Sequence, residues 1–199
     1  MLRSLLFLSL FLIGNLALAA TDTIPTPFKV KIDLSPESKN WREFNNYDGR
    51  FSILTPGEMT EKVDSVETPI GTLAYHTFYF QTEDKNADNV VYMLSYCDYP
   101  PGTVHSDSTD LIGELFAATL EAAQSSVDGE LMYKRNIKYN GFPGKMWRIN
   151  YLENGALIKT KAFVIKNRYY TLQTVTHKSR SLNRSSDKFL DSFKLIGDF

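Results

Sequence analysis

Three histidines are the residues of this chain best suited to proton transfer or metal binding, and they lie far apart. They are His76, His105 and His177. Zinc sites usually contain at least one pair of ligands close together in the sequence, and only His105 has other possible ligands nearby, Asp107 and Asp110. Aspartate and serine side chains also cap helices, and a helix is predicted directly after this segment. We therefore interpret it as a solvated loop and predict no metal site.

Sequence motifs for catalysis give no assignment either. The chain contains no G-x-S-x-G nucleophile elbow, no phosphate-binding P-loop and no G-x-G-x-x-G pattern. We predict no catalytic residues and no cofactor. Two alternatives stay open: an envelope hydrolase with a site built from scattered residues, and a carrier of small apolar ligands between an aromatic-rich sheet and a helix. The candidates for the hydrolase site are Tyr96, Asp98, His105 and Asp107.

Basic residues of the C-terminal part are the best candidates for binding. Lys159 and Lys161 are two positions apart in a predicted strand and therefore share one face of it. Arg168 sits at the next turn, and His177 and Arg180 follow the next strand. Because consecutive hairpin strands are neighbours, these residues could form one patch for anionic lipid headgroups, a cell-wall polymer or an acidic protein surface. The competing interpretation is a solvated rim that keeps the chain soluble.

Charge is divided unevenly along the chain, although the formal net charge is only −1. Residues 20–128 include seven basic and eighteen acidic residues, whereas residues 129–199 include fourteen basic and five acidic ones. This asymmetry can indicate an anionic partner for the basic part. The charges of the two parts can also neutralise one another across neighbouring strands. Near-neutral total charge, together with the export predicted next, argues against nucleic-acid binding.

The first twenty residues predict export. Arg3 precedes an apolar run from Leu5 to Ile13, and the small residues that follow suit a signal peptidase cleaving before Ala20. We expect a signal peptide at residues 1–19 and a periplasmic or secreted mature chain. The apolar run is about half as long as a membrane span and no second one follows it, so we expect no transmembrane segment in the mature chain.

The mature chain suits one domain preceded by a short arm. Residues 20–40 contain three prolines and predict an extended arm, and residues 41–199 predict a single domain. Cys97 is the only cysteine, so no intrachain disulfide can form. A reactive thiolate needs a neighbouring base or cation, and the sequence identifies none. We predict that Cys97 is buried in a strand.

Turn dipeptides divide the domain into short strands. Asn140-Gly141 and Asn154-Gly155 indicate hairpins, because both residue types accept the left-handed backbone of a type I′ turn. Amphipathic spacing predicts a long helix over 109–125 and a shorter one over 185–192. The predicted strands cover residues 41–45, 51–55, 60–67, 72–82, 90–99, 131–139, 145–152, 157–165 and 169–177.

Side-chain alternation indicates how the sheet is covered. Residues 73–80 and 90–97 are apolar at both odd and even positions, so both faces of these strands must be at least partly buried. Residues 146–151 alternate more cleanly, which is typical of a strand with one wet face. We predict an α+β fold: a central antiparallel sheet with a long helix on one face and shorter helical elements on the other.

Several short motifs occur in a set order between Trp41 and Leu195. They are Phe51-Ser52-Ile53-Leu54-Thr55-Pro56-Gly57, Asp98-Tyr99-Pro100, Gly141-Phe142-Pro143-Gly144, Asn167-Arg168-Tyr169-Tyr170-Thr171-Leu172 and Phe189-Leu190-Asp191-Ser192-Phe193. This order resembles the Mog1/PsbP-like superfamily, in particular its small bacterial exported members of unassigned function. The resemblance implies an α/β/α sandwich and a protein that acts by binding other macromolecules, as a photosystem subunit or a partner of a small GTPase does. It carries over no ligand set.

The sequence therefore predicts an exported, non-catalytic binding or assembly module. Its partner is expected to be an exported or envelope macromolecule, and the chain itself is expected to be a monomer.

Overall fold

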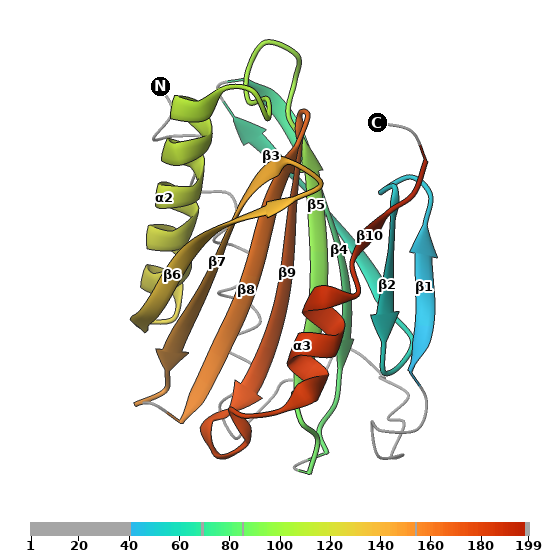
Figure 1. The fold of residues 1–199 in the computed structure, drawn as a ribbon, viewed down its shortest axis with the longest axis vertical. Helices are drawn as coiled ribbons and strands as arrows, with labels where there is room; N and C mark the ends of the chain where they lie inside the picture. The colour runs from blue at the N-terminus through green and yellow to red at the C-terminus, as the bar shows by residue number, and fades with distance from the viewer. Residues whose placement is uncertain (1–40, 69, 85, 154, 198–199) are drawn as a thin grey trace.

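The computed structural model of this 199-residue chain describes residues 41–68, 70–84, 86–153 and 155–197 (Figure 1). The predicted signal peptide at residues 1–19 and the predicted arm at residues 20–40 lie outside the described residues. The described residues all lie within the predicted domain, residues 41–199.

The strands of the described ranges form two sheets, and every strand pair in them is antiparallel. The seven-stranded sheet has the order β3-β4-β5-β9-β8-β7-β6, and the three-stranded sheet has the order β1-β2-β10. The strands are β1 (Arg42–Asn46), β2 (Phe51–Thr55), β3 (Thr60–Thr68), β4 (Gly71–Gln81), β5 (Val91–Asp98), β6 (Glu130–Tyr139), β7 (Phe142–Tyr151), β8 (Ala156–Ile165), β9 (Arg168–His177) and β10 (Lys194–Leu195). The helices are α2 (Thr109–Ser126), the 3-10 helix η3 (Lys178–Arg180) and α3 (Arg184–Asp191).

The predicted antiparallel sheet is confirmed, and each predicted strand overlaps an observed one. Hairpins join β3 to β4 and β4 to β5 at one side, and β6 through β9 at the other. The two sides meet where β5 pairs with β9. The sequence did not predict that the first hairpin leaves this sheet. β1 and β2 form a sheet of their own, completed by the two residues of β10.

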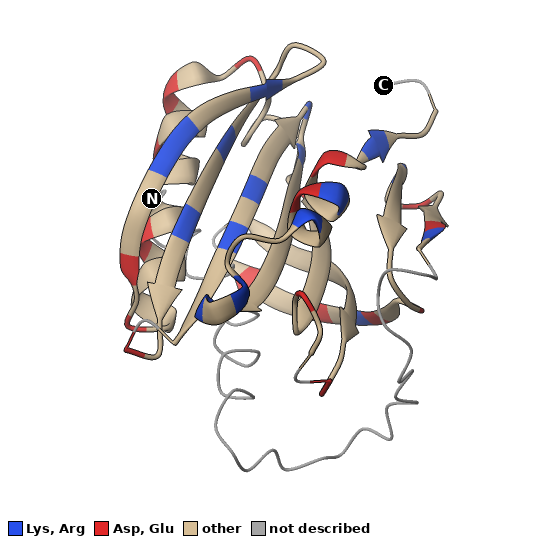
Figure 2. Ribbon diagram, turned by 60° about the horizontal axis from the view of Figure 1, so that its bottom comes forward, with Lys and Arg blue, Asp and Glu red and all other residues tan. Residues whose placement is uncertain are grey.

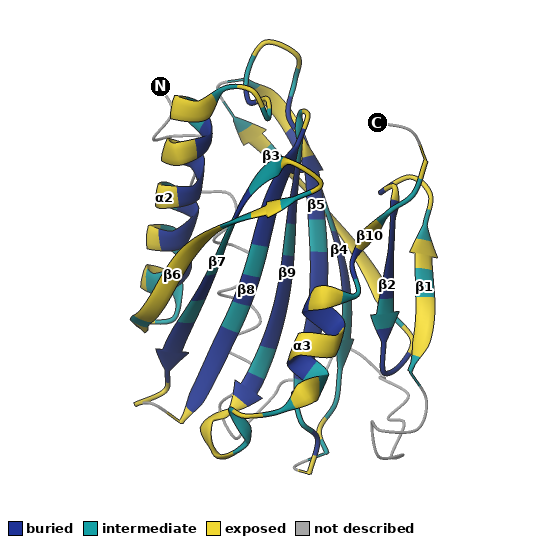
Figure 3. Cartoon of the chain, in the orientation of Figure 1, coloured by how far each residue is buried: buried dark blue, intermediate teal, exposed yellow. Residues whose placement is uncertain are grey.

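The long helix α2 packs on one face of the seven-stranded sheet. Its buried residues, among them Ile112, Phe116 and Leu120, recur at spacings of three and four, so they project from one side of the helix. These side chains share a core with Trp147 of β7 and Tyr169 of β9. Figure 3 shows the buried inner side and the exposed outer side of α2.

The opposite face of the sheet packs against the three-stranded sheet and α3. Aromatic rings dominate this second core: the ring centroids of Phe51 in β2 and Phe78 in β4 are 5.5 Å apart. Phe193, directly before β10, lies 5.3 Å from Tyr170 of β9. Phe189 of α3 is fully buried in the same cluster. Such ring contacts fix the small sheet on the large one.

The helix α3 is too short to cover all of this second face. It has eight residues and contacts β8 and β9, while β6 and β7 lie to one side of it (Figure 1). All five residues from Met132 to Asn136 of β6 are exposed, and Figure 3 shows the exposed ribbon of this strand. The pair β6–β7 and the adjoining part of β8 therefore present a wet sheet surface beside α3.

The two hairpin turns with Asn-Gly sequences differ. Asn140 and Gly141 both have a positive φ, 48° and 87°, as a type I′ turn requires. Among the described residues of the other turn, Leu152 and Glu153 are left-handed, with φ of 52° and 50°. The hairpin predicted from Asn154-Gly155 is confirmed by the pairing of β7 with β8, and Asn154 itself lies outside the described residues. The four-residue connection between Tyr151 and Ala156 puts the left-handed backbone earlier in the loop.

Cys97 is predicted to be chemically inert in the folded chain. Its side chain is fully buried in β5, and burial raises the pKa of the thiol to about 12. Only the thiolate attacks a disulfide reagent, and burial also blocks access. We expect a thiol reagent such as dithionitrobenzoate to label the native chain at pH 8 at least about 1,000 times more slowly than the urea-unfolded chain. Equal labelling rates would contradict this placement.

Candidate interaction surface

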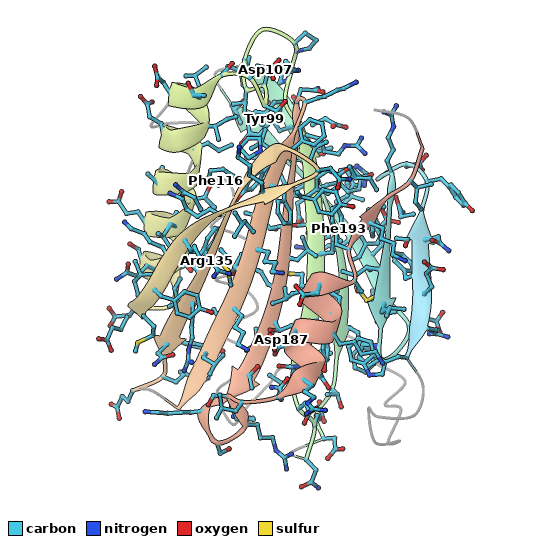
Figure 4. All side chains as sticks on the ribbon, in the orientation of Figure 1. Tyr99, Asp107, Phe116, Arg135, Asp187 and Phe193 are labelled. Atoms are coloured by element: carbon cyan, nitrogen blue, oxygen red, sulfur yellow. The ribbon has the colours of Figure 1, made fainter. Side chains whose placement is uncertain are left out.

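Four cationic side chains gather on the wet surface beside α3. They are Arg135 of β6, Arg148 of β7, and Lys159 and Lys161 of β8. We call this set the basic face. Figure 2 shows Lys and Arg on these neighbouring strands, and Figure 4 shows the labelled Arg135 on the sheet to one side of α3 and its labelled Asp187.

Strand register explains why these side chains point the same way. Arg148 is paired directly with Tyr133 on one side and with Lys159 on the other. Met146 is paired in the same way with Arg135 and Lys161. Directly opposed residues of antiparallel strands project to the same side, about 5 Å apart, and residues two apart in a strand share a face about 6.6 Å apart. The four cations therefore form two short rows on one surface.

The two lysines of the basic face are ion-paired with α3. The ammonium nitrogen of Lys159 lies 3.5 Å from a carboxylate oxygen of Asp187, and the ammonium of Lys161 contacts the carboxylate of Asp191. The first turn of this helix is capped, because the Asn183 side-chain oxygen accepts a hydrogen bond of 2.8 Å from the Ser186 backbone N–H.

The two arginines have neutral partners instead. The Arg148 Nε donates to the side-chain oxygen of Asn150 at 3.0 Å, and an Nη of Arg135 lies 3.0 Å from the sulfur of Met146. Among residues 41–197 that the structure describes, neither guanidinium has a carboxylate within salt-bridge distance. Arginine is the side chain best shaped to grip a carboxylate with two parallel hydrogen bonds. The arginines can therefore accept an external anion.

The predicted binding residues do not form one patch. Lys159 and Lys161 lie together, as predicted, but Arg168 and His177 are the first and last residues of β9. A ten-residue strand is about 30 Å long, so these two residues lie at opposite ends of the sheet. His177 is paired with Ala156, and Arg180 lies beyond it in η3, where it contacts Asn86 at 3.5 Å.

Arg168 serves the fold at its end of β9. Two of its nitrogens each donate to the carboxylate of Asp98 at 2.6 Å, and a third donates to the backbone oxygen of Asp48 at 2.8 Å. The guanidinium also lies 4.5 Å from the ring centroid of Tyr96. Burial disfavours the charge, but the hydrogen bonds to Asp98 and the interactions with Tyr170 together outweigh it and raise the pKa of Arg168 above its usual range. These donors are engaged within the chain.

Sequence reasoning missed Arg135 and Arg148 as candidates for binding. The signal was present in part, because the alternation of residues 146–151 predicted one wet face that includes Arg148. The Asn140-Gly141 turn fixes the register that brings Arg135 to the same side. What the sequence did not indicate is that α3 stops short of these strands.

The four candidates for a hydrolase site have different contacts. Both carboxylate oxygens of Asp98 accept hydrogen bonds from Arg168, and the Tyr96 ring stacks on His76 at 4.6 Å. His105 instead approaches the carboxylate of its neighbour Asp107 at 3.3 Å. Ser108 takes the N-cap position of α2, but its side chain makes no capping hydrogen bond. Within the described ranges no three His, Cys, Asp or Glu side chains are grouped so that they could hold a metal ion.

Comparison with known proteins gives the fold. No family model and no curated protein matches this sequence. Among solved structures, the chain is similar to cyanobacterial PsbP (CyanoP) from Synechocystis sp. PCC 6803, with a TM-score of 0.53 and 12% sequence identity. The match covers 85% of this chain and 99% of that one.

The chain has a PsbP-like fold. The resemblance read from the motifs is thereby confirmed at the level of fold, and an identity of 12% carries nothing further. Within its described residues the PsbP-like chain has no helix of the length and apolarity needed to cross a membrane. The basic face lies on the side of this fold that α3 covers only in part.

Proposed function

We propose that this chain is an exported, non-catalytic binding or assembly module that holds the acidic surface of a partner protein on its basic face. The observation that carries the proposal is the pair Arg135 and Arg148, two guanidiniums on one surface with no carboxylate partner among the described residues. The PsbP-like fold supports a binding role, and residues 1–19 support export.

The shape of the surface favours a protein over a membrane. A helix packed on a sheet stands about 10 Å above it, so α3 forms a ridge along one side of the basic face. A flat bilayer would meet this ridge before it met Arg148. A folded partner can place a protruding carboxylate beside the ridge, where partial burial strengthens each ion pair.

The test begins with capture in the producing cell. A photoreactive phenylalanine analogue in place of Tyr133, which is 40% exposed on the basic face, is expected to crosslink the partner. The same analogue in place of Asn136, on the opposite face of β6, serves as the control. Mass spectrometry of the crosslinked chain should find Ala20 as its first residue if export occurs as proposed.

Affinity for the purified partner then tests the surface directly. We expect Arg135→Gln combined with Arg148→Gln to raise the Kd on the order of 30-fold, because two charge-assisted contacts are lost. Lys134→Gln with Lys138→Gln removes the same charge from the other face of β6 and should change the Kd less than about twofold. Equal effects of the two double variants would overturn the proposal.

A further inference from the structure

One helix with two carboxylates on one side already lies on part of the basic face, and it belongs to the chain itself. Asp187 and Asp191 are four residues apart in α3, so both carboxylates point to the same side of the helix, about 6 Å apart along its axis. Lys159 and Lys161 are two residues apart in β8, about 6.6 Å. The two spacings match, and both ion pairs form.

The part of the basic face outside α3 repeats this charge pattern. Arg148 lies in the same cross-strand row as Lys159, and Arg135 lies in the same row as Lys161. A second pair of cations therefore stands at the same two levels as the first. Adjacent helices pack 8–10 Å apart, which is about the width of two strands. A helix beside α3, which contacts β8 and β9, would lie over β6 and β7.

The remaining side chains of this surface suit a helix with one apolar stripe. Met146 separates Arg135 from Lys161 within its row, and Ile137 is half-buried one step further along β6. Glu130 is paired with Asn150, one step beyond the row of Arg148. This carboxylate would repel a third anionic group of a bound helix. The cationic part of the surface is therefore limited to the two cross-strand rows of Arg148 and Arg135.

We propose that the basic face receives an acidic α-helix of a partner protein, which lies beside α3 and places two carboxylates, three or four residues apart, on Arg148 and Arg135. The inference rests on the proposed function and specifies its partner. α3 is the internal example of the interaction, and the arginines extend it to a second helix. Flexible polyanions and lipid headgroups lack this fixed spacing.

A pair of stapled peptides tests the spacing. Both are helical 15-residue chains of the same composition; one presents aspartates at positions i and i+4, and the other at i and i+2, on different sides of the helix. We expect the first to bind the whole mature chain about tenfold more tightly and to shift the amide NMR signals of β6 and β7. Arg135→Gln with Arg148→Gln should weaken binding of the i, i+4 peptide about tenfold. Lys134→Gln with Lys138→Gln should leave its affinity nearly unchanged.

Exchanging the charges of the protein and the peptide tests the proposed contact more directly than removing them. The variant Arg135→Asp with Arg148→Asp should lose the aspartate peptide and bind a lysine peptide of the same i, i+4 spacing. Equal binding of the two aspartate peptides would overturn the inference. So would tighter binding of polyphosphate or of phosphatidylglycerol vesicles, or NMR shifts confined to the loop at Arg180. A captured partner that contacts Tyr133 through a loop or strand would contradict the helix but leave the proposed function standing.

Discussion

Asn89→Ala is expected to lower the free energy of unfolding by about 3 kcal/mol. Asn89 is fully buried in the segment before β5, and its amide connects three parts of the chain. The amide nitrogen donates to the Tyr92 hydroxyl at 2.8 Å. The amide oxygen accepts from the hydroxyls of Thr176, at the end of β9, and of Ser186, in the first turn of α3, the latter at 2.7 Å.

Alanine would remove the hydrogen bonds of Asn89 from an interior that admits little water. Thr176 and Ser186 are both fully buried; Ser186 keeps the hydrogen bond of 3.2 Å that it accepts from the Thr174 hydroxyl, whereas the Thr176 hydroxyl loses its acceptor. An unsatisfied buried hydroxyl costs about 1–3 kcal/mol. Stabilities of single domains are typically about 5–15 kcal/mol, so the loss is a large share of the total.

Urea unfolding followed by circular dichroism measures the change. Asn86→Ala is the matched control, because Asn86 is exposed three residues earlier and its side chain accepts a long hydrogen bond, 3.5 Å, from Arg180. We expect this control to change stability by less than about 0.5 kcal/mol. A loss below about 1 kcal/mol for Asn89→Ala would show that the network does not hold α3 to the sheet.

The sequence predicted the elements well wherever the deciding signal was local. The Asn140-Gly141 turn indicated its hairpin because both residues adopt the backbone that the turn needs. The two-residue spacing of Lys159 and Lys161 placed them on one face, as the structure has them. The predicted long helix, 109–125, agrees with α2 to within one residue.

The rest depends on contacts between residues far apart in the chain. The sheet formed by β1 and β2 depends on β10, which has only two residues and pairs with β2 from the other end of the chain. Arg168 could be counted as a binding residue only while Asp98, 70 positions away, and Asp48, 120 positions away, were not placed beside it. Sequence spacing carries no information on such pairs.

The basic face depends both on local strand register and on contacts between residues far apart in the chain. Arg135 and Arg148 share a surface because of local hairpin register. Their availability to a partner depends on where α3 lies, and that follows from the burial of Phe189 and from the polar network around Asn89. Stability of α3 and access to the arginines are therefore linked: the same contacts that hold the helix over β8 leave β7 uncovered.

Arg168→Met is the second substitution with a large expected effect, about 3 kcal/mol of unfolding free energy. The arginine side chain is only 13% exposed and donates to both Asp98 and the turn between β1 and β2. Methionine is an unbranched side chain that removes every donor and also the guanidinium that lies 4.5 Å from the Tyr96 ring centroid. The Tyr170 hydroxyl, which donates to the Gly49 oxygen at 2.8 Å, would remain as a hydrogen bond from β9 to that turn.

A double-mutant cycle separates the ion pair from the attachment of the turn. Asp98→Asn alone keeps a neutral acceptor, and the coupling energy between the two sites should be about 1–3 kcal/mol. Amide exchange in β1 and β2 should accelerate in Arg168→Met more than in Asp98→Asn, because only the first variant loses the bond to the Asp48 oxygen. Equal acceleration would place the effect in the ion pair alone.

Affinity for the captured partner distinguishes the structural role of Arg168 from the binding role of the basic face. Arg168 donates to Asp98 and to Asp48 within its own chain, and it lies at the end of β9 that pairs with Ile165. The basic face occupies the two cross-strand rows that contain Lys159 and Lys161, nearer the middle of β8. Arg168→Met should therefore reduce stability and leave the Kd of the captured partner within about twofold. Arg135→Gln with Arg148→Gln should instead raise that Kd and leave the stability nearly unchanged. Loss of affinity in Arg168→Met at temperatures where the chain stays folded would move the binding surface to the end of β9.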